Sequence, residues 1–484
     1  MEYAAISDIS QKADVYFYDY LTSAQKESLS FLNNDDEITA YAKKISERFK
    51  HFINLYASHE GLVQTLCDIA YEKYGILPPL KKPSSDLDNA VTVTVPLQNK
   101  ISQIYPVTDT DTDTELKLGF HKTTVSVSSV IFRLSDEIWW RRKLRKHYKQ
   151  KLEAKAIYHG KVHRRKGKYI SDDGLVRFKS QKTRNRRILE NTTATNELGQ
   201  EFTLQDLSDR NVSNPELRFN ELITRISGFE DTAKSLGHIS MFYTITCPSR
   251  MHARSSITGK QNLKYDGTTP DHAQKHLVLT WSRIRAALSN LGIRLYGMRV
   301  AEPQHDGTPH WHLLVFMPKE HENKVTEVIR KYAMAEDGYE AGAKKHRFDA
   351  VKMDIENRRA TGYIIKYISK NISGRGLDSD IDGGEPISAA ERVNAWASHW
   401  GIRQFQQLGG PPVSLWREVR RLGNVGLNTV IREIKEAANT PSWGDFVKLL
   451  GGPLANRKEL VISLAKDRLD RLNQDFEPGS KQII

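Results

Sequence analysis

The chain has 484 residues, of which 39% are hydrophobic and 27% charged, a composition that supports packed cores over roughly two to four domains and excludes wholesale disorder. Lysine and arginine total 72 against 59 acidic residues, so the net charge of +13 favours a polyanionic partner, nucleic acid before an anionic membrane. With two cysteines, no apolar run as long as about eighteen residues and no signal-peptide pattern, a disulfide framework, a Cys-based zinc site and a membrane partner are not expected, and a cytoplasmic location is predicted.

Residues 1–130 carry few chemical signals and are predicted to form a mostly helical region of unknown role. Basic runs follow: seven lysines and arginines lie between Arg141 and Lys151, and further runs cover 163–168 and 177–190. These runs are either a solvated helical face or an arm that contacts DNA phosphates. Because the basic residues cluster instead of mixing with acids, residues 131–230 are predicted to form a basic helical DNA-contacting region. The predicted contacts are Arg141, Arg142, Lys143, Arg145 and Lys146.

The clearest secondary-structure pattern covers residues 231–375. Strands are predicted at 239–246, 294–302, 310–317 and 347–354, and helices at 270–292, 319–334 and 359–372. The order β-α-β-β-α-β, then α, predicts an α+β domain of the split-βαβ (ferredoxin- or RRM-like) type, an antiparallel sheet with helices on one face. Residues 387–484 are predicted to be a helical accessory region. The P-loop pattern G-x-x-x-x-G-K-[ST] is absent, so a built-in motor is not expected.

Two histidines flank a tryptophan in the stretch "PHWHLLVF", which begins at Pro309. Residues two apart on a strand share a face, so His310 and His312 point the same way. If the preceding turn closes symmetrically about Asp306, Glu302 lies opposite His310, with Cβ atoms about 5 Å apart. Two imidazoles and a carboxylate then form a three-ligand metal site with open positions, with His305 as a reserve ligand. The alternative is a pair of surface histidines or of core histidines bonded to the backbone.

The helix predicted at 359–372 contains "YIIKYISKNI". At helical spacing one face carries Tyr363, Lys366, Tyr367 and Lys370, and the other carries four isoleucines. Because the isoleucines already supply a buried stripe, the tyrosines need not be core aromatics. Two hydroxyls flanked by ammonium groups suit phosphate chemistry, since a phenol with a pKa near ~10 needs cationic neighbours to act as a nucleophile. The lysines either bind phosphates or only solvate the helix.

These motifs resemble those of the HUH endonucleases that initiate rolling-circle replication, and most closely those of the replication gene A proteins of temperate tailed phages. The resemblance covers roughly residues 130–425. Its motifs are "FYTITCPSRMH" (242–252), "EPQHDGTPHWHLLVF" (302–316) and "GYIIKYISKNI" (362–372), with similar flanking segments at 212–230 and 395–422.

The resemblance implies an HUH endonuclease domain at 231–375 that nicks origin DNA of a phage or prophage in a bacterial host. Glu302, His310 and His312 would hold Mg²⁺ or Mn²⁺, and Tyr363 and Tyr367 would in turn form a 5′-phosphotyrosine link and reseal the strand. Thr244 and Thr246 would line the DNA groove. A host helicase and a DNA polymerase would be partners.

Two other classes stay open. A non-catalytic DNA-binding replication factor would explain the basic runs, and a metal-dependent hydrolase using activated water would explain the three ligands but not the tyrosines.

Overall fold

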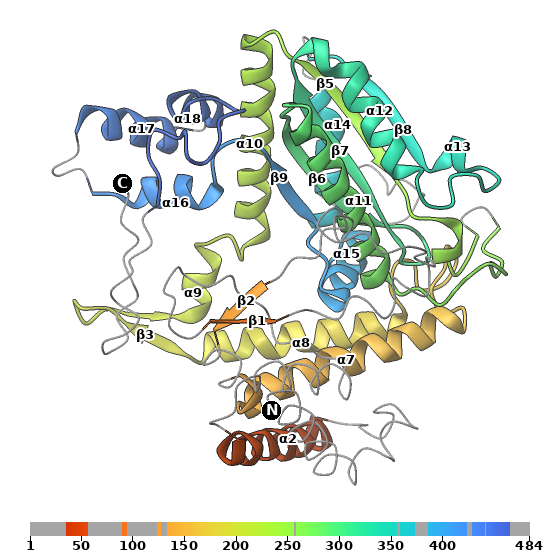
Figure 1. Cartoon of the computed structure of the whole chain (residues 1–484). Coiled ribbons are helices and arrows are strands. Elements are labelled where there is room, and N and C mark those ends of the chain that lie inside the picture. Colours follow the sequence, from red (N-terminus) through yellow and green to blue (C-terminus); the bar gives the residue numbers. More distant parts are fainter. Residues whose placement is uncertain are drawn as a thin grey trace, which may run out of the picture. The chain divides into compact units, whose positions relative to one another are not determined.

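The computed structural model describes residues 35–56, 90–93, 123–126, 133–255, 258–355, 359–372, 386–423, 428–440 and 442–464 (Figure 1). The chain divides into two compact units, residues 1–152 and 153–484. Most of the region predicted to be helical at 1–130 lies outside the described residues. None of the helices in the described part of the chain combines the length and the apolar character that crossing a membrane requires.

The first unit contains the helix α2 (Asp35–Tyr56), the short antiparallel strands β1 (Ala90–Val93) and β2 (Thr123–Ser126), and most of α7 (Glu137–Tyr158). Trp140 joins α7 to α2, because its buried ring stacks on Phe49 with the ring centroids 5.4 Å apart. The Trp140 indole also donates to the carbonyl of Leu134 at 2.8 Å. The aromatic start of the basic run is therefore part of a local core.

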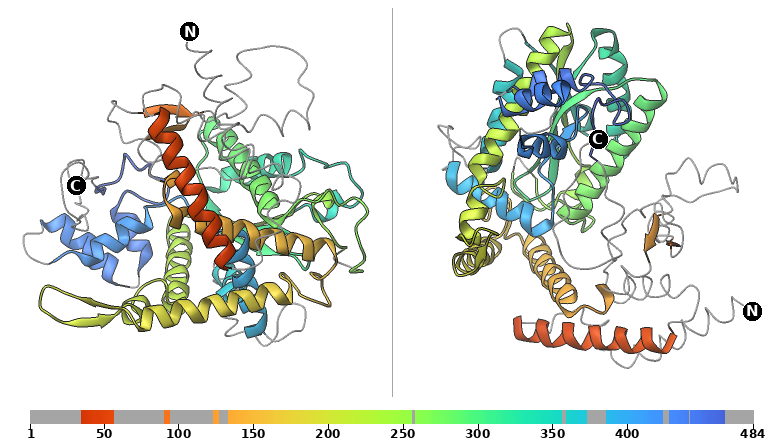
Figure 2. Two further views of the ribbon diagram at one scale, coloured as in Figure 1. Left: turned by 90° about the horizontal axis from the view of Figure 1, so that it is seen from below. Right: turned by 90° about the vertical axis from the view of Figure 1, so that its left-hand side faces the viewer.

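The second unit begins at the end of α7 and continues through helices and a small hairpin before its main sheet. These elements are α8 (Asp172–Glu190), β3 (Thr193–Thr195), β4 (Glu201–Thr203), α9 (Leu204–Asp209) and α10 (Pro215–Ser235). The β3–β4 hairpin projects from the C-terminal end of α8 (Figure 2). Ser171 caps α8 by accepting from the backbone N–H of Gly174, as is typical of a helix start.

The main sheet has five strands, and every neighbouring pair is antiparallel. Its strands, in the order β8-β5-β7-β6-β9, are β8 (Phe348–Met353), β5 (Ile239–Ile245), β7 (Pro309–Met317), β6 (Tyr296–Pro303) and β9 (Phe405–Leu408). The helix α11 (Pro270–Asn290) connects β5 to β6, and α12 (Glu322–Ala333) connects β7 to β8. Short helical turns η2 (Ser249–Met251), η3 (Lys319–His321) and α13 (Ala343–His346) lie in the connections. The predicted α+β class with an antiparallel sheet is confirmed, with element bounds that differ from the predicted ones by a few residues.

Helices cover both faces of this sheet, whereas the sequence predicted helices on one face. On one face, α11, α12 and α15 (Pro386–Trp400) pack against Trp311 and Leu313. On the other, α10 and α14 (Arg359–Ile372) pack against Val300 and Leu314. The reason is that every residue of β6 is buried, and a strand buried on both faces needs cover on both.

A second helical layer lies beyond α10. The helices α16 (Val413–Arg421), α17 (Thr429–Asn439) and α18 (Trp443–Leu449) surround the buried Trp443, and Figure 1 shows α10 between α18 and the sheet. Gly228 allows the close approach of α18, since a Cβ there would lie 2.6 Å from the backbone nitrogen of Gly444.

Candidate active site

The β6–β7 hairpin brings Glu302 directly opposite His310, as the symmetric closure about Asp306 predicted. The turn is closed by the backbone N–H of Gln304, which donates to the carbonyl of Thr308 at 2.7 Å. Gly307 has φ +85°, a left-handed conformation that favours glycine. The register therefore follows from a tight turn whose chemistry is visible in the sequence.

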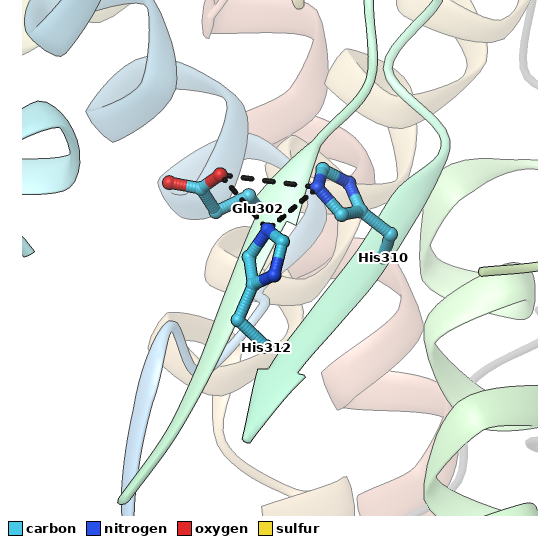
Figure 3. Close-up of side chains that lie close together, drawn as sticks. All are labelled: Glu302, His310 and His312. Atoms are coloured by element: carbon cyan, nitrogen blue, oxygen red, sulfur yellow. Dashed lines mark hydrogen bonds and ion pairs between the residues drawn. The ribbon is translucent and has the colours of Figure 1, made fainter. Parts of the chain in front are cut away.

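Glu302, His310 and His312 converge on one point at the end of this hairpin (Figure 3). Oε2 of Glu302 lies 3.8 Å from Nε2 of His310 and 3.5 Å from Nε2 of His312. The two Nε2 atoms are 2.9 Å apart, and all three ligand atoms lie within 4.8 Å of one another. Two imidazole nitrogens and one carboxylate oxygen directed at one point are the donor set of a divalent metal with open positions, so these residues fit such an ion.

The other nitrogen of His312 is held by a neighbouring strand. Nδ1 of His312 is hydrogen-bonded to the hydroxyl of Thr244 on β5 at 3.1 Å, which leaves Nε2 for the cluster. Thr244 thus faces the metal-ligand cluster. Thr246 lies elsewhere: its hydroxyl donates to the carbonyl of His346. The reserve ligand His305 is not part of the cluster, and its ring stacks on Tyr169.

The buried charges of the cluster favour the protonation states that bind a metal. Burial alone would raise the pKa of Glu302, but Lys370 and the two histidines outweigh it and lower this pKa to about 2. Burial, together with the neighbouring His312, lowers the pKa of His310 to about 3. Glu302 is therefore a carboxylate and His310 a neutral imidazole at neutral pH.

Both tyrosines of α14 lie beside this cluster. The hydroxyl of Tyr367 donates to that of Tyr363 at 3.3 Å, and the Tyr367 ring centroid lies 4.1 Å from that of His312. Phe242 on β5 supports both tyrosines, at centroid distances of 4.7 Å to Tyr363 and 5.5 Å to Tyr367. Tyr363 is 38% exposed and Tyr367 is half-buried, and burial together with the Tyr363 hydroxyl raises the pKa of Tyr367. Two phenols, about one helical turn apart on α14, therefore lie next to the proposed metal ligands.

The two lysines of α14 differ in position. Lys366 is exposed, as expected for its polar face. Lys370 is buried, and its Nζ lies 3.8 Å from Oε2 of Glu302, so the interpretation that it only solvates the helix does not describe it. The cause is that the C-terminal turn of α14 packs against β6, which periodicity alone does not indicate.

Two residues of the site were missed by the sequence reasoning. Asn371, fully buried, donates from its amide to Oε1 of Glu302 and to the carbonyl of Tyr367. The amide of Gln404, just before β9, donates to Oδ1 of Asn371 at 3.1 Å. Asn371 lies four residues after Tyr367, so helical spacing was a signal for it, whereas Gln404 gave none.

The basic residues predicted to contact DNA are on α7 in the first unit, and the cluster is in the second. Arg142 and Lys146 are exposed, and Arg141, Lys143 and Arg145 are partly buried. The Nζ of Lys143 lies 5.5 Å from the centroid of the Trp139 ring, and burial together with Lys146 lowers its pKa. Of the five predicted contacts, Arg142 and Lys146 are therefore the most accessible to a DNA strand.

Taken together, the second unit is an α+β protein with a two-histidine, one-carboxylate cluster facing a helix that carries two tyrosines. Comparison with known proteins identifies the family. Residues 91–375 match the model of the bacteriophage replication gene A protein (GPA) family, and the chain belongs to this family. The resemblance expected from the sequence motifs is confirmed.

Several curated proteins are similar to this chain. The replication gene A protein of Escherichia phage 186 is 40% identical over 358 residues, which cover 72% of this chain and 51% of that protein. The probable replication protein P12 of Pseudoalteromonas phage PM2 is 40% identical over 73% of this chain and 56% of its own length. A probable replication endonuclease from a prophage-like region of Salmonella typhimurium is 33% identical over 69% of this chain and 43% of its own length. The chain thus spans about half the length of the curated relatives it matches, and no solved structure matches it.

Proposed function

We propose that the chain is a site-specific single-strand DNA endonuclease that starts rolling-circle replication of a phage or prophage genome in the cytoplasm of a bacterial host. Residues 231–375 would be a split-βαβ nuclease domain of the HUH class. The observation that carries the proposal is the position of the two tyrosines: their hydroxyls are 3.3 Å apart, and the Tyr367 ring lies 4.1 Å from the ring of His312, one of the three candidate metal ligands. The names of the relatives support the replication role and, for the Salmonella protein, an endonuclease activity.

In the proposed reaction, a tyrosine oxygen attacks the scissile phosphorus and the bond from phosphorus to the 3′-oxygen breaks. The tyrosine proton leaves, the 3′-oxygen gains a proton, and a 5′-phosphotyrosine link and a free 3′-hydroxyl result. Mg²⁺ or Mn²⁺ bound at the cluster would supply Lewis-acid polarisation of the phosphate oxygens. Lys366, on the exposed side of α14, would contact the strand, and Lys370 balances the charge of Glu302.

Two tyrosines on one helix allow both cleavage and resealing. While one holds the 5′ end, the other is free to cut the regenerated origin, and the released 3′-hydroxyl attacks the first link to close the circle. The free 3′-hydroxyl would prime a host DNA polymerase, and a host helicase would open the duplex.

The test is a covalent adduct with single-stranded DNA, using oligonucleotides tiled across the genome that encodes the chain. We expect Tyr363→Phe and Tyr367→Phe each to keep some adduct, and the double variant to form none. These substitutions remove only hydroxyls that bond to each other, so the fold should be retained. Tyr339→Phe, at a tyrosine that is 91% exposed, is the matched control and should behave as the unaltered chain.

Mass spectrometry of the trapped adduct would assign the linked residue. An adduct on another residue, or one that persists in the double variant, would contradict the assignment. Cleavage without any adduct would favour a hydrolase that uses activated water, and origin binding without cleavage would favour a non-catalytic replication factor.

A further inference from the structure

A basic turn, residues 163–168, connects α7 to α8 in the second unit. The backbone N–H groups of His163 and Lys166 each donate to the other residue's carbonyl, at 2.9 and 3.1 Å. The side chains of Arg164, Arg165 and Lys166 are exposed. Among the described residues none of these three side chains has an ion pair, so the turn presents three charges without a neutralising acid.

Tyr169 fixes this turn against the metal-site hairpin. It is 2% exposed and has φ +73°, a left-handed conformation that is unfavourable for a residue other than glycine. Its backbone N–H donates to the carbonyl of His305 at 3.3 Å, and its ring stacks on the His305 ring with an interplanar angle of 8°. A strained residue persists only where its surroundings hold it, so these contacts fix the position of the turn beside the hairpin.

The same ring connects the turn to the catalytic cluster. Nζ of Lys370 lies 5.5 Å from the centroid of the Tyr169 ring and 3.8 Å from Oε2 of Glu302. Gly307, in the hairpin turn, also lies against this segment, since a Cβ there would be 3.1 Å from the Tyr169 carbonyl. The basic turn is therefore two side-chain contacts away from a metal ligand.

Further basic groups lie beside the turn, although Lys161, two residues before it, pairs with Asp173 at 3.8 Å. The Arg254 guanidinium lies against Gly160, where a Cβ would come 2.1 Å from its Nη2. Burial lowers the pKa of His163, and Arg254, Arg165 and Lys166 lower it further. The hairpin carboxylates do not offset this charge, because Glu302 is engaged by Lys370 and the buried Asp306 faces His252 at 3.3 Å.

We propose that the basic turn forms one side of the active site and binds the backbone phosphates of single-stranded DNA next to the cleavage point. The inference rests on the proposed function for its substrate. Lysine and arginine contacts to phosphates give affinity and register without reading sequence, so the turn would hold any strand that the site cleaves. Its role is positioning, since it does not touch the tyrosines or the metal ligands.

The first experiment measures binding without cleavage, by fluorescence anisotropy of the full chain with labelled oligothymidylate in chelator over a salt series. The variant carries Arg164→Gln, Arg165→Gln and Lys166→Gln. The control carries Lys275→Gln, Arg283→Gln and Arg285→Gln, three exposed residues of α11, which packs on the face of the sheet away from Glu302, His310 and His312. With about 0.7 per lost contact on single strands, the log–log salt slope of the variant should fall by about 2 and that of the control should not change. An unchanged slope in the variant, or an equal fall in the control, would overturn the proposal.

The second experiment places the contact relative to the nick. On the origin strand, the variant should need about tenfold more DNA than the unaltered chain to reach half of its maximal rate of adduct formation. Its rate at saturating DNA should stay within about threefold of that of the unaltered chain. The reason is that three lost contacts weaken DNA binding but leave the cluster intact. If only the rate of adduct formation at saturating DNA fell, the result would contradict the proposal that the turn only positions the strand. A chain that binds DNA with the expected slopes and forms no adduct would disprove the proposed cleavage and leave the phosphate contact standing.

Discussion

The hydrogen bond from Asn371 to Glu302 offers a quantitative test of the metal site. The amide of Asn371 is fully buried and donates to Oε1, so that Oε2 alone faces the two imidazoles. A hydrogen bond to a charged group contributes about 1.5–3 kcal/mol. At about 1.4 kcal/mol per factor of ten, Asn371→Ala should weaken metal binding roughly 10- to 100-fold, the range typical of groups that orient a metal ligand.

The assay is calorimetric titration of Mn²⁺ into the chelator-treated full chain, without DNA. Asn394→Ala is the matched control. Like Asn371, Asn394 donates two hydrogen bonds from its amide, but both go to backbone carbonyls, those of Ile372 and Ala390, and neither goes to Glu302. Near-UV circular dichroism would confirm that both variants stay folded. If Asn371→Ala binds Mn²⁺ within about threefold of the unaltered chain, or if the control loses as much affinity, Glu302 is not held by this bond in the way that the geometry indicates.

Three further predictions concern the cluster and the basic helix. Nicking of single-stranded origin DNA should need a divalent ion, and His310→Ala and His312→Ala should lose cleavage while still binding DNA; full nicking in chelator would contradict the metal site. Neutralising Arg141, Arg142, Lys143, Arg145 and Lys146 should reduce the salt slope of DNA binding by roughly 0.7 for each lost contact, and an unchanged slope would mean that these residues only solvate α7. The pKa of His310 is lowered from 6.5 to about 3, so the folded chain binds fewer protons than the unfolded chain between these values, and its stability falls as the pH falls from about 6.5 towards 3. In chelator, denaturant unfolding of His310→Gln should therefore show a shallower loss over this window, and equal slopes would assign the pH dependence to other groups.

The sequence predicted those parts of the site that depend on local geometry. The two-residue period of a strand places His310 and His312 on one face, and the turn about Asp306 places Glu302 opposite. The helical period likewise separates Tyr363 and Tyr367 from the isoleucines, of which Ile364, Ile368 and Ile372 are buried. Period and register are set within a few residues, so these arrangements can be read before the chain is folded.

The parts that were missed depend on contacts between distant segments. Helical spacing gives the direction of Lys370 but not its depth, which follows from the packing of α14 on β6. Gln404 and Tyr169 reach the site from segments that come together only in the fold, and neither has a local signal. The cover that α10 gives to the second face was missed for the same reason. This helix precedes β5 in the chain but packs against three strands of the sheet, β5, β6 and β7.

The electrostatics of the cluster explain why a buried lysine lies beside a carboxylate that is a candidate cation ligand. A lone buried carboxylate is costly, and Lys370, 3.8 Å from Glu302, offsets that cost in the chain itself. Lys370 balances the charge of Glu302, and His310 is neutral. Under the proposed function, a divalent ion bound there would supply positive charge to the phosphate, where negative charge grows during transfer. Burial raises the pKa of Tyr367, so this half-buried phenol needs nearby positive charge to stabilise its oxygen when it loses its proton.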